Sequence, residues 1–113
     1  MDDLGRALAN FQVRVDGNPM VRKMLKDWNR HIVVKPTTGP PYSLVISKAR
    51  LEQIVEEELS DAEVMLTARD EVLVGIFDGS INPADAYASG DLLFHGTIQD
   101  EMRLDAVVQY VWD

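Results

Sequence analysis

Residues 64–96, VMLTARDEVLVGIFDGSINPADAYASGDLLFHG, decide the fold because they place two short helices between two strands. The first helix is predicted to end at Gly79, since glycine reaches the left-handed conformation at little cost. The second begins at Asn82-Pro83, where asparagine caps the helix and proline occupies its first position, and it ends at Gly90. None of these residues matches a catalytic pattern, so the stretch predicts the order of helices and strands and does not indicate a catalytic site.

The two strands of this stretch are recognised by their alternation. Residues 64–68 and 91–97 alternate between two faces along the chain, as half-buried strands do. Thr67 and Asp70 have the spacing of a capping box, in a variant form. This spacing predicts that the first helix begins there.

Two helices are predicted before the sheet. Residues 2–16 place apolar side chains at helical spacing, and Asn18-Pro19 starts a second helix by the same cap-and-proline device. The apolar face of that second helix is predicted to consist of Met20, Met24 and Trp28, with Val21 and Leu25 beside them. We expect a single domain over 1–113, with helices in 1–30 and the sheet and its covering helices in 31–113.

The middle of the chain contains one clear pattern and one ambiguous pattern. Residues 31–35 and 42–48 are strand-like and are separated by the turn TTGPP, so they predict an antiparallel hairpin. Residues 48–61 are rich in helix formers, which slightly favours a helix, whereas a strand would align Leu51, Gln53 and Val55. At the C-terminus a further helix is predicted, because Leu104, Val107, Val108 and Val111 share one helical face.

The composition excludes several classes of function. A net charge of −8 and a pI of about 4.6 disfavour nucleic acid and anionic membrane surfaces as partners. The absence of cysteine removes disulfides, thiolate metal sites and cysteine nucleophiles. The first residues are acidic where a signal peptide is basic, and no apolar run approaches the roughly 20 residues that cross a bilayer. We therefore expect no nucleic-acid partner, no stable membrane insertion and a cytoplasmic location.

Catalytic constellations are sparse. His31 and His95 fall in predicted strands without the spacing of metal ligands. Ser89, Asp91 and His95 are close in sequence, but no G-x-S-x-G elbow surrounds the serine. Glycine-rich nucleotide-binding motifs are missing, although any two of the 19 carboxylates could still meet as an acid–base pair. We therefore expect no enzymatic activity, no metal and no cofactor.

Large apolar side chains are more prominent than polar ones. Phe77, Tyr87 and Phe94, together with Leu73 and Ile76, either fill a core or line a cavity for a small apolar molecule. The same residue types serve both purposes, and helical periodicity does not distinguish a full core from a hollow one. Both alternatives stay open on the residues alone.

The residues from Gly79 to Gly96 read G-x-x-N-P-x-x-A-Y-x-x-G-x-L-x-F-x-G. This order resembles the run G-K-x-N-P-x-x-A-F-x-x-G-K-L-x-I-x-G of the sterol carrier protein type two family of lipid-transfer domains. The strand and helix before Gly79 are similar as well, so the resemblance covers residues 62–112. Ser80 and Asp91 replace the two lysines of that run, which puts a basic mouth for anionic head groups or coenzyme A in doubt.

The resemblance implies an α+β fold, in which a five-stranded, mostly antiparallel sheet is covered on one face by helices. It also implies a strand rather than a helix at 51–57. In that family an apolar tunnel holds fatty acids, acyl-CoA or sterols. The side chains expected to line it here come from three helices and the last strand: Leu73, Phe77, Tyr87, Phe94, Met102, Leu104, Val108 and Trp112.

The sequence therefore supports non-catalytic binding or transfer of a hydrophobic small molecule such as a fatty acid, an acyl-CoA or a sterol-like lipid. The alternative is a non-catalytic interaction or accessory subunit of an enzyme complex, with the same fold and a collapsed tunnel. Such a subunit would contact a partner enzyme, or a second copy as a homodimer, through its acidic surface and the face of Met20, Met24 and Trp28. A small hydrolase ranks last, because no nucleophile–base pair is visible.

Overall fold

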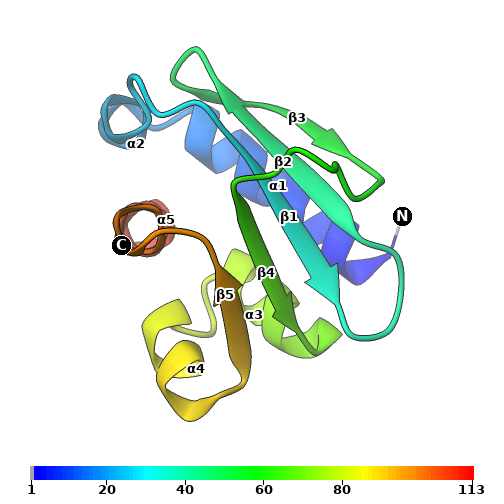
Figure 1. The fold of residues 1–113 in the computed structure, drawn as a ribbon. Helices are drawn as coiled ribbons and strands as arrows, with labels where there is room; N and C mark the ends of the chain where they lie inside the picture. The colour runs from blue at the N-terminus through cyan, green and yellow to red at the C-terminus, as the bar shows by residue number, and fades with distance from the viewer. Residues whose placement is uncertain (1) are drawn as a thin grey trace.

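The computed structural model describes residues 2–113 and contains, within them, a five-stranded sheet of order β3-β2-β1-β4-β5 (Figure 1). β1 and β4 are parallel, and the other neighbouring pairs are antiparallel. The predicted α+β class with a mostly antiparallel sheet is confirmed. The strands are β1 (Arg30–Pro36), β2 (Tyr42–Ser47), β3 (Arg50–Val55), β4 (Val64–Ala68) and β5 (Leu92–His95). The helices are α1 (Asp3–Asp16), α2 (Pro19–Met24), α3 (Asp70–Asp78), α4 (Pro83–Ser89) and α5 (Ile98–Trp112).

One face of the sheet carries the main hydrophobic core. The register places Val34 of β1 opposite Tyr42 of β2 and Leu66 of β4, and Leu66 opposite Phe94 of β5. Because side chains alternate along strands, these residues point to the same side, where they join the core that the helices supply. Within residues 2–113, no helix is long and apolar enough to cross a bilayer.

The opposite face is covered in part by the connection between β3 and β4. Ser43 is fully buried there, and its hydroxyl donates to the Glu57 carbonyl at 2.6 Å and accepts from the Leu59 N–H at 3.0 Å. Val33, its partner in the ladder, is buried beside it. The connection thus shields the centre of this face without any helix.

The ambiguous segment at 48–61 contains a strand, β3, as the resemblance implied and against its slight local preference for helix. Leu51 is fully buried and pairs with Ile46 of β2. At the outer edge of β3, the Leu51 carbonyl accepts from the Gln12 side chain at 2.8 Å, and the Leu51 N–H donates to Asp16 at 3.0 Å. Side chains of α1 therefore satisfy this edge, a tertiary contribution that local helix propensity does not include.

The helix boundaries agree with the turn chemistry in most places. The Asn82 side chain accepts from the Ala84 N–H at 2.8 Å, and Gly79 and Gly90 are left-handed at φ +87° and +86°. The predicted capping box of Thr67 is wrong: within residues 2–113 no side chain caps α3, which begins after Arg69. Thr67 belongs to the β4 ladder, and this sheet pairing takes precedence over the local capping pattern.

The predicted apolar face of α2 is also wrong. Met20 is 52% exposed, whereas Val21, Leu25 and Trp28 are buried. The helix ends at Met24, so Trp28 is not on a helical stripe but follows a turn in which Asp27 has φ +60°. The surface proposed for the interaction subunit therefore lacks its tryptophan.

Candidate functional site

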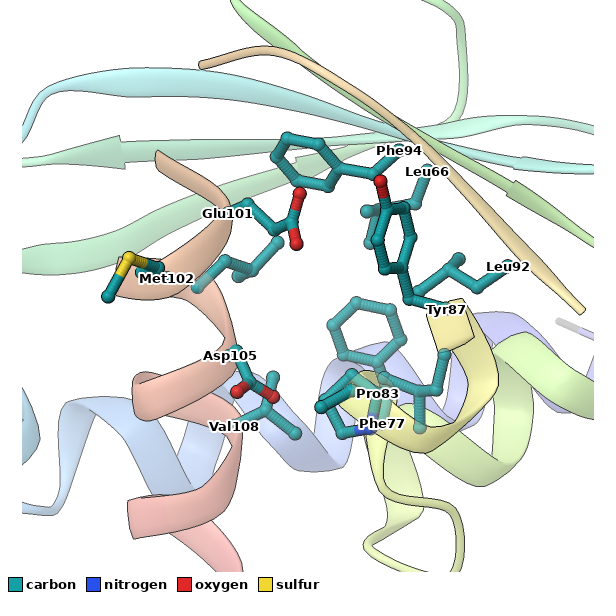
Figure 2. A pocket seen from close by; sticks show the side chains of 13 residues that line it. Leu66, Phe77, Pro83, Tyr87, Leu92, Phe94, Glu101, Met102, Asp105 and Val108 are labelled. Atoms are coloured by element: carbon teal, nitrogen blue, oxygen red, sulfur yellow. The ribbon is translucent and has the colours of Figure 1, made fainter. Parts of the chain in front are cut away.

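A cavity of about 120 Å³ lies between the β4–β5 side of the sheet and helices α3, α4 and α5 (Figure 2). Its walls are mainly aliphatic and aromatic, with polar groups concentrated on α5. The lining residues are Leu66, Leu92 and Phe94 of the sheet, Ile76 and Phe77 of α3, Pro83, Ala84 and Tyr87 of α4, and Glu101, Met102, Leu104, Asp105 and Val108 of α5.

The cavity has a buried floor and an exposed mouth. Phe77 and Ile76 are at most 1% exposed and form the floor, whereas Tyr87 is 49% and Met102 is 66% exposed. Figure 2 shows the rings of Phe94 and Tyr87 on one side of the opening and α5 on the other. A molecule in the cavity would therefore meet apolar groups from the mouth to the floor.

The floor is a fixed part of the core. The Phe77 ring meets the Phe11 ring of α1 edge-to-face, with centroids 5.1 Å apart. Gly75 in α3 allows Ile81 to approach the helix closely, because a Cβ at Gly75 would lie 2.4 Å from the Ile81 Cδ1 atom. These contacts fix α3 against α1 and the chain that leads into α4.

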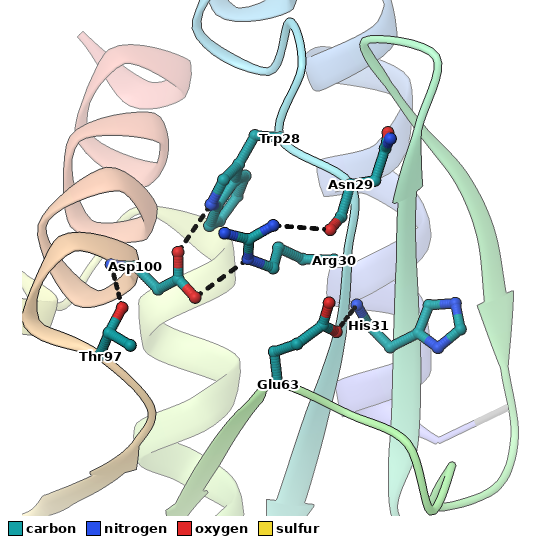
Figure 3. Close-up of polar contacts among 7 residues, drawn as sticks. All are labelled: Trp28, Asn29, Arg30, His31, Glu63, Thr97 and Asp100. Atoms are coloured by element: carbon teal, nitrogen blue, oxygen red, sulfur yellow. Dashed lines mark hydrogen bonds and ion pairs between the residues drawn. The ribbon is translucent and has the colours of Figure 1, made fainter.

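The N-terminal end of α5 is anchored by a buried carboxylate (Figure 3). Asp100 is 5% exposed and accepts from the Trp28 indole N–H at 2.8 Å and from the Arg30 guanidinium at 3.0 Å. Burial alone would raise the pKa of Asp100, but the hydrogen bonds from Arg30 and Trp28 outweigh burial and lower that pKa. The Thr97 hydroxyl caps the helix by accepting from the Asp100 N–H at 3.1 Å.

The C-terminal end of α5 is held by Trp112. Its ring packs directly over Gly79, where a Cβ atom would lie 2.6 Å from the indole carbons, and the Arg14 guanidinium lies 4.2 Å from the ring centroid. Trp112 therefore joins α5 to the end of α3 and to α1.

Helix α4 is the least embedded wall of the cavity. Ala86 is its buried residue, whereas Ala84 and Tyr87 are exposed although they line the cavity. Elements with few buried apolar contacts open at lower free energy than the core does. Of the three helices around the cavity, α4 is thus the one that we expect to move most readily.

Two carboxylates, Glu101 and Asp105, lie in the cavity wall one helical turn apart. The Asp105 Oδ2 atom accepts from the Gln109 amide at 3.2 Å, whereas its Oδ1 atom is buried and has no hydrogen-bond partner among residues 2–113. The sequence analysis did not identify either acid as a candidate site residue, because it considered only the apolar positions of this helix. The available signal was spacing: both acids share a helical face with Leu104 and Val108.

The structure brings together most of the residues predicted to bind a ligand. Around the cavity lie Phe77, Tyr87, Phe94, Met102, Leu104 and Val108. Leu73 is instead fully buried in the main core, and Trp112 packs on Gly79, so neither lines the cavity. That the lining residues bind a ligand stays a prediction.

The positions where the resemblance led us to note missing lysines lie outside the cavity lining. Asp91 accepts from the Ser89 hydroxyl at 3.1 Å and lies 3.9 Å from the Arg69 guanidinium. The Ser80 N–H donates to the Asp78 side chain at 2.9 Å, just beyond α3. Both residues thus serve the turns around α4.

The matched region identifies the family. A model of the SCP-2 sterol transfer family matches residues 12–109. The chain belongs to this family. No curated protein sequence matches the chain.

Solved structures of this family share the fold. The sterol carrier protein domain 2 of Helicoverpa armigera aligns with a TM-score of 0.79 at 11% identity, over 97% of this chain and 88% of its own. The sterol carrier protein-2 of Aedes aegypti, in complex with palmitate, gives 0.72 at 16% identity over 96% of each chain. A ubiquinone synthesis protein, UbiJ-SCP2, gives 0.71 at 18% identity, over 91% of this chain and 85% of its own.

Proposed function

We propose that this protein binds and carries a hydrophobic small molecule in the cavity between the sheet and helices α3, α4 and α5. The observation that carries the proposal is an apolar cavity with a buried floor and a mouth flanked by the exposed side chains of Tyr87 and Met102. Membership of a sterol-transfer family supports it, as does a neighbour of the same fold that holds palmitate.

The volume of the cavity indicates that the structure is a closed form. At about 120 Å³ it is slightly smaller than the roughly 150 Å³ cavity that accommodates benzene. Pockets for larger ligands measure about 300–1,000 Å³. A lipid chain therefore requires a wall to move outward, and α4 is the wall with the least burial.

Burial of hydrocarbon is the main favourable contribution to binding in such a carrier. Each buried methylene contributes about 0.8 kcal/mol, so ten contribute about 8 kcal/mol. Association itself costs about 4–15 kcal/mol, and the displacement of α4 adds to that cost. A rigid floor keeps this additional cost small, because α3 and α5 are already fixed by Phe11 and Asp100.

We propose carriage without a covalent step. The Ser89 hydroxyl donates to Asp91 and to the Ala86 carbonyl at 3.1 Å each, contacts that belong to the end of α4. His95 alternates with Phe94 along β5 and therefore points to the opposite face of the sheet from the cavity. These three residues do not form a catalytic arrangement at the cavity.

Binding is tested with a matched pair of tryptophan substitutions on α4. Ala84 lines the cavity and Ala88 does not, although both are exposed. We expect Ala84→Trp to weaken binding of the neutral probe N-phenyl-1-naphthylamine at least about tenfold, and Ala88→Trp to leave it unchanged. Mass spectrometry of an organic extract of the freshly purified protein provides an independent readout. No probe binding and no extracted lipid would reject the carrier in favour of the accessory subunit.

A further inference from the structure

The two charged side chains of the cavity are both carboxylates, and the Tyr87 hydroxyl at the mouth is a further polar group. Glu101 and Asp105 both line the cavity, and among residues 2–113 none of the lining side chains is a lysine, arginine or histidine. Figure 2 shows both carboxylates extending from α5 toward the space between α5 and α4. Carboxylates accept hydrogen bonds and repel other anions, so the cavity distinguishes between ligand head groups.

The Asp105 side chain lacks one of its hydrogen bonds. Gln109 donates to its Oδ2 atom, while the Oδ1 atom is buried with no donor among residues 2–113. A buried carboxylate oxygen without a donor is unfavourable, and the deficit is removed when a donor arrives. Because the Oδ1 atom is buried, a ligand O–H or N–H group supplies this donor once the cavity wall moves outward, as the proposed carrier function requires.

Glu101 and Asp105 lie at different positions along α5, and therefore at different positions along the cavity. Asp105 lies one turn further into α5 than Glu101, on the same face as buried Leu104 and Val108. Glu101 is level with the mouth, near Phe94 and Tyr87 in Figure 2. A ligand that passes the mouth thus meets a carboxylate first at Glu101 and then at Asp105, with apolar walls on the remaining sides.

We propose that the cavity selects apolar molecules whose polar group is a hydrogen-bond donor, namely a hydroxyl or an amine, over molecules that end in a carboxylate. This rests on the proposed carrier function and specifies its ligand class. The donor pairs with Asp105, while the hydrocarbon part occupies the floor around Phe77. A fatty acid anion would instead place a third carboxylate beside two others in a space of about 120 Å³.

The test compares three ligands of equal chain length: dodecanol, dodecylamine and dodecanoate. Each displaces N-phenyl-1-naphthylamine from the intact protein near neutral pH, below the concentration at which it forms micelles. We expect the alcohol and the amine to displace the probe at concentrations at least about tenfold lower than dodecanoate. Both the amine and the alcohol donate a hydrogen bond, but only the amine carries a positive charge. Comparison of the two therefore distinguishes attraction of a positive charge from donation of a hydrogen bond.

Two charge-neutralising substitutions assign the selectivity to its residue. Asp105→Asn keeps the shape of the side chain and removes its charge, so dodecanoate should improve about tenfold relative to dodecanol. Asp85→Asn, on the exposed side of α4, serves as the control and should leave the ratio unchanged. Glu101→Gln provides a second variant at the mouth if Asp105→Asn does not fold, with the same direction of change.

The outcomes separate the two proposals. If the probe does not bind at all, the carrier function is rejected. If the probe binds and dodecanoate displaces it as well as dodecanol does, the carrier function stands and the donor selectivity is wrong. An alcohol-to-acid ratio that stays the same in both Asp105→Asn and Glu101→Gln also overturns the donor selectivity.

Discussion

Gly79 and Gly90 end consecutive helices with nearly the same backbone and very different surroundings. Their φ angles are +87° and +86°. A Cβ atom at Gly79 would lie 2.6 Å from the Trp112 ring carbons, closer than atoms can pack. At Gly90, apart from its chain neighbours, no heavy atom of residues 2–113 lies within 4 Å of that position. Alanine at each site therefore separates backbone strain from steric conflict.

The expected changes in the free energy of unfolding follow from backbone strain and steric conflict. A left-handed backbone costs an L-residue about 1–2 kcal/mol, and the lower entropy of the unfolded chain returns about 0.4–1 kcal/mol. Gly90→Ala should therefore lower the free energy of unfolding by about 1 kcal/mol. Gly79→Ala adds about 1–3 kcal/mol of overpacking against Trp112, for a total of about 2–4 kcal/mol.

Urea unfolding followed by circular dichroism measures both values. With a slope of about 1–3 kcal/mol per molar, the midpoint of Gly79→Ala should lie about 1 M below that of Gly90→Ala. In a Trp112→Leu background the extra cost at Gly79 should disappear, as a double-mutant cycle would show. Equal midpoints for the two alanine variants would refute the role assigned to Trp112.

Two further predictions concern pH. Because the pKa of Asp100 is lowered by Arg30 and Trp28, its stabilisation is present above the unfolded value of about 3.9 and is lost as the pH falls through the folded value. Asp100→Asn should thus lower the free energy of unfolding by about 2 kcal/mol near pH 7, and in urea titrations the difference from the parent should shrink as the pH falls below the unfolded value. Burial and the hydrogen bond to Asp2 raise the pKa of Tyr42 to about 12. The Tyr42 hydroxyl therefore stabilises the fold fully below the unfolded pKa of about 10, and this contribution is lost as the pH rises through about 12. Tyr42→Phe should be about 1 kcal/mol less stable than the parent near pH 8, with a smaller difference near pH 11; a constant difference would contradict the assignment.

Local stereochemistry made the turns of this fold predictable. Gly79, Gly90 and Asn82-Pro83 each have a conformational preference that a few neighbouring residues determine. Thr67 has such a preference as well, but its backbone is paired in the β4 ladder, so the predicted cap does not form. Sheet pairing depends on distant strands, and local sequence does not include it.

Helical periodicity predicted which residues of α5 share a face, but it did not predict which surfaces these residues pack against. Helical spacing correctly placed Leu104 and Val108 on one face, and both line the cavity together with Met102, which was included on the family resemblance. Trp112 lies further along the same helix, but the open space above Gly79 accommodates its ring, so it packs there instead. Which side chain faces a cavity depends on where the opposing surface lacks volume, and this is a property of the assembled fold.

Asp91 replaces a lysine of the family-like run, and the structure changes what this replacement implies about the ligand. From sequence, an acid in place of lysine at this position weakened the argument for an anionic head group. The structure places Asp91 outside the lining, beside Arg69 and Ser89, so its charge acts on the end of α4. Under the proposed donor selectivity, the head-group preference depends instead on Glu101 and Asp105, which the family-like run does not include. The case against anionic ligands therefore rests on the cavity carboxylates and not on the missing lysine, and the Asp105→Asn substitution tests it directly.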